Sequence, residues 1–137
     1  MSGPATPTAD GVTTKASSHT FAETMNRLTT LILGKGLTLF AVIDHRGAAE
    51  HVGLAMPDTK VVIFGSPVGG TPVMVAAPLA ALDLPLKMLV WADAEGAVWV
   101  SYNTAQYLAT RHHLTDDLRA RLEAIESISD AIVSPVP

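Results

Sequence analysis

Apolar residues recur every three or four positions between residues 21 and 32, which is the spacing of one buried helix face. Thr20 and Glu23 have the spacing of a capping box, in which a hydroxyl and a carboxylate each bind a free backbone N–H at a helix start. Gly34 follows the last apolar position, and glycine commonly ends helices. We therefore expect a helix that begins at the Thr20 cap.

Shorter runs of alternating or continuous apolar residues are typical of strands. The last two such runs flank residues 93–96, a loop of hairpin length whose glycine can take the positive φ of a tight turn. These two runs are expected to pair antiparallel, which would bring Trp91 and Trp99 opposite each other. The predicted strands cover residues 12–16, 37–43, 60–64, 86–92 and 97–102.

Helix signals of a second kind come from capping residues and proline. Thr71 precedes Pro72, and proline is well tolerated at the first position of a helix, so a brief helix is expected at 73–77. Thr115 is the expected cap of a last helix, and the apolar stripe that follows it predicts one long helix ending before Pro135. Two further short helices are predicted at 48–52 and 105–112.

The order of these elements predicts an α+β fold. A hairpin joins two of about five strands, so an antiparallel or mixed sheet with helices packed on one face fits better than regular βαβ winding. We expect one domain over residues 12–134, preceded by a flexible tail over residues 1–11 that is rich in Pro, Thr, Ser and Ala.

Composition excludes several classes of protein. Of 137 residues, 48% are hydrophobic and 16% charged, and the net charge of −4 provides no basic surface for nucleic acid. Every apolar run is too short to cross a bilayer. The chain has no cysteine, and its first residues lack a basic start and an apolar stretch, so we expect a cytoplasmic protein without membrane or nucleic-acid partners.

Several segments together resemble one family. They are the Asp44-His45 loop, residues 62–67 (VIFGSP), residues 70–72 (GTP), residues 81–87 (ALDLPLK) and residues 98–102 (VWVSY). On these motifs the chain resembles the bacterial and archaeal domain of unknown function 302 family over residues 21–114. The resemblance implies a TBP-like fold with a β-α-β4-α arrangement and a homodimer. It implies no reaction, substrate or cofactor, so the cofactor and the catalytic residues stay unknown.

The candidate binding residues lie in loops, except Tyr102, which lies at the far end of the predicted hairpin. The glycine-rich turn 65–71 resembles a phosphate loop but lacks the Gly-Lys-Ser/Thr ending, so a strand-to-helix turn is the stronger interpretation and weak anion binding the alternative. His45 follows a strand in a polar loop, where it could act as a base or bind a ligand, and Asp83 is either a site acid or a turn aspartate. The candidate ligand-binding residues are His45, Gly65, Ser66, Pro67, Gly70, Thr71, Asp83 and Tyr102.

Recognisable catalytic and metal motifs are missing from the sequence. None of the five histidines forms an i, i+4 pair with another, and there is no HExxH, so no metal site is predicted. No serine lies in a GxSxG elbow, and thiol chemistry is impossible without cysteine.

Three functions remain as hypotheses. The first is a homodimeric module that binds a small anionic or apolar ligand in a pocket roofed by His45, the 65–71 loop and Asp83. The second is a small enzyme in which His45 and Asp83 exchange protons, which requires the two side chains to be no more than about 8 Å apart. The third is a purely structural or interaction role through dimerisation.

Overall fold

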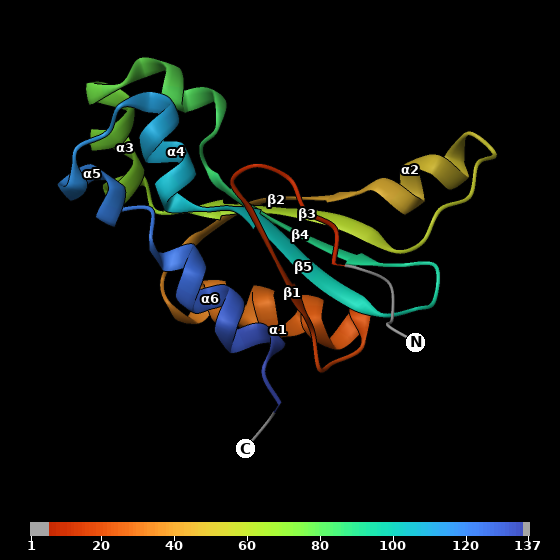
Figure 1. The fold of residues 1–137 in the computed structure, drawn as a ribbon. Coiled ribbons are helices and arrows are strands. Elements are labelled where there is room, and N and C mark those ends of the chain that lie inside the picture. Colours follow the sequence, from red (N-terminus) through yellow and green to blue (C-terminus); the bar gives the residue numbers. More distant parts are fainter. Residues whose placement is uncertain (1–5, 136–137) are drawn as a thin grey trace.

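The computed structural model describes residues 6–135 as an antiparallel sheet with helices on one face and at both ends (Figure 1). The strands are β1 (Val12–Ala16), β2 (Thr38–Asp44), β3 (Thr59–Gly65), β4 (Leu86–Ala92) and β5 (Val98–Asn103). The helices are α1 (Phe21–Gly34), α2 (His45–His51), α3 (Pro67–Ala76), the 3-10 helix η1 (Pro78–Leu82), α4 (Ala105–His112), α5 (Asp116–Ala120) and α6 (Ala124–Val133).

The five strands lie in the order β1-β5-β4-β3-β2, and each neighbouring pair is antiparallel. Strands β4 and β5 form the predicted hairpin, with Trp91 opposite Trp99. When the short helices are set aside, the chain runs through one strand, one helix, four strands and a last helix. This order confirms the predicted α+β class and the TBP-like β-α-β4-α arrangement.

The core lies between the sheet and two helices, α1 and α6, which pack against each other and cover one face (Figure 1). Strand residues at alternate positions face these helices, because successive side chains of a strand point to opposite sides. Burying each large apolar side chain stabilises the fold by about 1.5–3 kcal/mol relative to leaving it in water. The fully buried side chains of this layer include Val62, Phe64, Met88, Val90 and Val100 from the sheet and Leu28, Ile32, Ile125, Ile128 and Ile132 from the helices.

Helix α1 begins as the sequence predicts. The backbone N–H of Glu23 donates to the Thr20 hydroxyl at 3.1 Å, and the backbone N–H of Thr20 donates to the Glu23 carboxylate at 3.2 Å. These two bonds satisfy donors that the first turn would otherwise leave free. The capping box is therefore confirmed.

The sheet face opposite the helix layer carries the intervening strand residues. The indole rings of Trp91 and Trp99 stack there, with centroids 6.1 Å apart and planes 23° from parallel. The Trp91 indole N–H donates to the Ser101 hydroxyl at 3.0 Å, and Ser101 shares a 2.8 Å hydrogen bond with Thr14 of the edge strand. The Trp99 indole N–H donates to Asp93 in the hairpin turn. Polar contacts thus tie three strands together on this face.

The shorter helices lie at the two ends of the sheet. Helices α3, η1, α4 and α5 gather at the end where β3 finishes, and α2 projects beyond the other end (Figure 1). Asp44 caps α2 by accepting the backbone N–H of Gly47 at 2.9 Å. In the register of β2 with β3, Thr38 pairs with Gly65 and Asp44 with Lys60. Helices α2 and α3 therefore begin at opposite ends of the sheet.

The prediction of a brief helix at 73–77 is wrong, because α3 begins earlier, at Pro67. The cap is Ser66 rather than Thr71: the Ser66 hydroxyl accepts the backbone N–H of Gly69 at 3.1 Å. The glycines of this turn indicated a break, yet Gly69 belongs to the helix. A β-carbon at Gly69 would lie 3.8 Å from the carbonyl oxygen of Arg121, an ordinary van der Waals distance, so the start of α3 packs against Arg121.

The prediction of one long last helix is also wrong, because a tight turn at residues 121–123 separates α5 from α6. In this turn the backbone N–H of Leu122 donates to the carbonyl of Arg119, three residues back instead of four. The tighter winding rotates the chain, and Leu122 becomes buried against the core.

The predicted flexible tail, residues 1–11, falls partly on residues 1–5, which lie outside the described residues. Its last residue is held by the domain. The carbonyl of Gly11 accepts the backbone N–H of Thr104 at 2.9 Å, and Gly11 lies directly against the ring of Tyr107.

Candidate functional site

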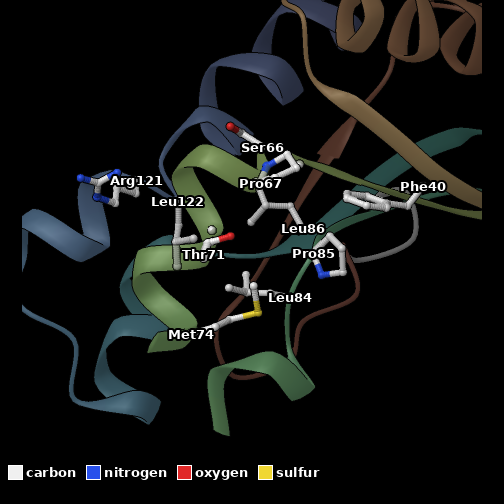
Figure 2. Close-up of a pocket in the computed structure, with 12 residues that line it drawn as sticks. Phe40, Ser66, Pro67, Thr71, Met74, Leu84, Pro85, Leu86, Arg121 and Leu122 are labelled. Carbon is white, nitrogen blue, oxygen red and sulfur yellow. The ribbon is translucent and has the colours of Figure 1, made fainter. Parts of the chain in front are cut away.

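A pocket of about 310 Å³ opens where β3 passes into α3 (Figure 2). One wall is α3, and a second is the segment that leads from η1 into β4. Phe40 of β2 and the turn between α5 and α6 complete it. The lining residues are Phe40, Gly65, Ser66, Pro67, Gly70, Thr71, Met74, Leu84, Pro85, Leu86, Arg121 and Leu122.

The β3–α3 turn forms a rigid wall because its polar groups are already bonded. Ser66 caps the helix through its side chain, and the backbone N–H of Gly70 donates to the Ser66 carbonyl at 2.7 Å. Gly65 is buried, and a β-carbon there would lie 3.6 Å from the Pro85 ring. The turn therefore lies against Pro85 at an ordinary van der Waals distance.

The segment 83–86 faces this turn, and contacts outside the pocket anchor it. Leu86 is buried and pairs with Phe64 of β3. The Asp83 carboxylate points to α4, where its Oδ2 lies 2.5 Å from His112 Nε2 and 3.4 Å from Arg111 Nη1. Lys87 donates to the backbone carbonyl of Asp83 at 3.2 Å rather than to its carboxylate.

The chemistry of the lining is mainly apolar. The hydroxyls of Ser66 and Thr71 are its polar side-chain groups apart from Arg121, whose guanidinium lies at the outer side of the pocket, away from Met74 and Phe40 (Figure 2). No carboxylate or histidine of residues 6–135 lines the pocket. The arrangement can bind by shape and apolar contact, and it offers no general acid or base.

Five of the eight predicted binding residues line this pocket. They are Gly65, Ser66, Pro67, Gly70 and Thr71. The structure does not support the alternative that the 65–71 turn binds an anion. The Ser66 side chain caps the start of α3, where an anion would bind, and the surrounding wall is apolar.

His45, Asp83 and Tyr102 do not join the pocket. Asp83 adjoins the lining residue Leu84, but its carboxylate is bound to His112. Tyr102 lies on the helix face of the sheet, where its hydroxyl donates to Glu126. Strand alternation explains this placement, because Tyr102 shares a face with the buried Val100.

His45 lies at the opposite end of the sheet. In the pairing of β2 with β3, Thr38 lies opposite Gly65 beside the pocket, and Asp44 lies opposite Lys60. Thr38 and Asp44 are six residues apart on β2, and at about 3.3 Å per residue this distance is roughly 20 Å. The expectation that His45 roofs a pocket with Asp83 is therefore wrong. Leu86 pairs with Phe64, so even the start of β4 lies at least about 13 Å along the sheet from His45.

A polar cluster that is separate from the pocket lies around Tyr102, on the helix face of the sheet. Lys15 Nζ lies 5.2 Å from the centre of the Tyr102 ring and donates to Ser129 at 2.5 Å and Asp130 at 2.8 Å. Burial acts to lower the pKa of Lys15, but hydrogen bonds to Asp130 and Tyr102 outweigh it and raise that pKa above 10.5. A lysine held in its charged form cannot take a proton from Ser129, so this pair is structural.

Sequence reasoning missed the remaining lining residues for different reasons. A family-like motif contains Leu84, Pro85 and Leu86, and this motif could have indicated them as binding residues. Leu122 belonged to a helical stripe. Phe40 carried no signal, since its orientation depends on an irregularity in β2. The other missed residues are Met74 and Arg121.

The fold and the pocket define an α+β domain with a small apolar cavity at one end of an antiparallel sheet. The chain belongs to the family described as Domain of unknown function DUF302, which matches residues 13–132. The crystal structure of an uncharacterized conserved DUF302 protein from Bacillus stearothermophilus has the same fold, with a TM-score of 0.75 at 18% identity, over 91% of this chain and 97% of that one.

Curated relatives carry a different kind of name. Proteins named Fluoride-specific ion channel FluC 1, from Brucella suis biovar 1 and Brucella abortus biovar 1, are each 38% identical over 104 residues. The match covers 76% of this chain but only 41% and 38% of those proteins, so the chain spans about two fifths of their length. Within residues 6–135, the helices are too short or too polar to span a bilayer. The same residues hold no group of three or more His, Cys, Asp or Glu side chains arranged to bind a metal ion.

Proposed function

We propose that this protein is a cytoplasmic, homodimeric module that binds one small, mainly apolar molecule in the pocket between α3 and residues 84–86. The observation that carries the proposal is that two separate family-like motifs, at 62–67 and 81–87, supply facing walls of one cavity. Apolar cavities of roughly 300 Å³ and more, with a few polar groups, are the usual form of small-molecule sites.

The rigidity of the walls supports binding of a defined ligand. The Ser66 cap holds one wall, and the pairing of Leu86 with Phe64 holds the other. A pocket formed in advance spares the ligand the entropy cost of ordering its site.

The enzyme hypothesis that paired His45 with Asp83 has lost its support, because at least about 13 Å of sheet separates them. An apolar surface without a pocket would favour the interaction hypothesis, whereas this molecule has both. The binding hypothesis therefore accounts for both the pocket and the apolar surface, whereas the interaction hypothesis accounts only for the surface.

A matched pair of glycine substitutions tests the pocket. Gly70 lines it, and a β-carbon added at either Gly70 or Gly34 would have nothing within 4 Å, so we expect both helix positions to accept leucine. We expect 2-naphthol, as a neutral two-ring probe, to raise the Tm of the wild type and of Gly34→Leu, because binding to the native state stabilises it. In Gly70→Leu the new side chain fills the cavity, and the increase in Tm should disappear.

The measurement is a thermal-shift titration of all three proteins. An increase in Tm that persists in Gly70→Leu would move the binding site elsewhere. The absence of any increase in the wild type would contradict the proposal for ligands of this class.

The homodimer of this proposal uses the sheet face that carries Trp91 and Trp99. Leu89, Val61 and Ile63 share that face, because they alternate with residues buried under α1 and α6. A broad apolar surface that includes aromatic side chains is typical of an interface between subunits.

A second candidate function rests on the similarity to proteins named fluoride-specific ion channels. In this proposal the domain works beside such a channel and modulates it. Deleting the matched 104 residues from the Brucella suis relative should change fluoride efflux from proteoliposomes, and adding this chain should restore it. Equal efflux under all three conditions would argue against this function.

A further inference from the structure

We propose that Phe40 forms a stacking wall of the pocket, so that the site selects a flat, neutral, two-ring aromatic molecule with one hydroxyl group. This inference rests on the proposed binding function and specifies its ligand. Four observations carry it: an irregularity in β2, the exposure of Phe40, the shape of the lining and the volume of the cavity.

A β-bulge determines where Phe40 lies. Leu39 pairs with Phe64 and Ala41 with Ile63, so two neighbouring residues of β3 face three residues of β2. Phe40 is the extra residue and has no partner in the ladder. Bulges commonly redirect a side chain next to a functional site, and here the redirected ring lines the pocket.

The exposure of Phe40 is unusual for a ring on a sheet that has a well-filled core. The side chain is 50% exposed even though it contacts the cavity, so one side of the ring stays open to solvent. A ligand in the cavity would cover more of this ring. Covering apolar surface stabilises the bound state by roughly 25 cal/mol per Å².

The lining around Phe40 suits a flat ligand. Phe40 and Pro85 lie on one side of the pocket, and Leu122 and Thr71 lie on the other (Figure 2). Aromatic rings attract one another in offset-stacked or edge-to-face geometry, an interaction that a saturated ring of the same size cannot make. The Met74 thioether, at the base of the view in Figure 2, adds a polarizable group that favours aromatic neighbours.

Volume and polarity set the size and charge of the ligand. A cavity of about 150 Å³ accepts benzene, so 310 Å³ accommodates two fused rings. The Thr71 hydroxyl makes no hydrogen bond to residues 6–135 and can bind one hydroxyl of the ligand. Among the residues that the structure describes, the lining has no carboxylate or histidine, and the Arg121 guanidinium lies at its outer side, so the inner part of the pocket favours a neutral molecule.

The experiment compares two probes of nearly equal size on matched variants. 2-Naphthol is flat and aromatic, whereas 2-decalol has the same carbon skeleton but is saturated and puckered. Calorimetric titration should show 2-naphthol binding on the order of tenfold more tightly to the wild type. Phe40→Ala should weaken 2-naphthol on the order of tenfold and abolish the preference, and Phe40→Leu should keep binding of both probes but reduce the preference.

Val42→Ala is the control, because Val42 is on the same strand and 42% exposed but does not line the pocket. It should bind both probes like the wild type.

Equal affinity of the wild type for the two probes, or unchanged 2-naphthol binding by Phe40→Ala, would overturn the role of Phe40. If Gly70→Leu still loses both probes in that case, the proposed binding function stands; if the wild type binds neither probe, both proposals fail.

Discussion

Single side chains in this protein take their roles from the partner they contact more than from their chemical type. Asp83 belongs to a family-like motif, yet its carboxylate binds His112, whose side chain is only 7% exposed, on a helix 29 residues further along the chain. Gly11 shows the same dependence on contacts. Its φ of +75° suits glycine, and a β-carbon at this position would lie 2.1 Å from the Tyr107 ring.

We predict that Gly11→Ala destabilises the domain by about 2–4 kcal/mol, the sum of a left-handed backbone penalty and an overpacked contact. Gly53→Ala is the matched control: its φ is +81° but nothing lies within 4 Å of the new methyl group, so only about 1–2 kcal/mol is expected. Urea denaturation measures both. Equal losses in the two variants would show that the contact with Tyr107 contributes nothing.

At the scale of elements, helix and strand ends follow local rules, and the exceptions arise where an element packs against another. The Thr20 capping box forms as predicted, and the hairpin turn is held by Asp93, which accepts the Trp99 indole N–H. That hydrogen bond, with three from backbone N–H groups, lowers the pKa of Asp93 below 3.8. The last helix, in contrast, breaks at residues 121–123, and Leu122 of this turn packs into the core.

The capping box should make stability depend on pH. Hydrogen bonds from the Thr20 side chain and backbone lower the pKa of Glu23 below its ordinary value of 4.5. A carboxyl whose pKa is lower in the folded state stabilises that state above its unfolded pKa, and this stability is lost as the pH falls through the folded pKa. Glu23→Gln should therefore be less stable than the wild type near about pH 7, and the difference should shrink toward zero near about pH 3.

Thermal unfolding at a series of pH values measures this difference. Glu95→Gln, at an exposed turn position, is the control and should follow the wild type throughout. A difference for Glu23→Gln that stays constant down to acid pH would mean that the charge of Glu23 has no part in the cap.

At the scale of the whole molecule, the helix layer leaves the two sheet faces unequal. One face lies under α1 and α6 (Figure 1). The other presents the Trp91–Trp99 stack together with Leu89 and Ile63. An antiparallel sheet commonly has one solvated, polar face, but here that face is largely apolar. This asymmetry is the physical ground for the proposed homodimer.

We predict a mass of twice the 14.4 kDa chain in sedimentation equilibrium. The double variant Ile63→Thr and Leu89→Thr should shift the protein to the monomer, because it removes apolar contact area while threonine remains compatible with a strand. Leu33→Thr, which changes a 62% exposed leucine on α1, should leave the mass unchanged. A monomeric wild type, or a double variant that remains dimeric, would exclude this face as the interface.

The sequence by itself determined the fold class, the five strands, the capping box and the hairpin. These features depend on side-chain alternation, backbone angles and hydrogen bonds between near neighbours in the chain, so a local pattern is enough to predict them. Only the tertiary structure decided that Phe40, Leu84 and Leu122 meet Gly65 in one cavity and that His45 lies at the far end of the sheet. Strand register and the bulge at Phe40 set these long-range contacts, and each depends on how segments far apart in the chain fit together.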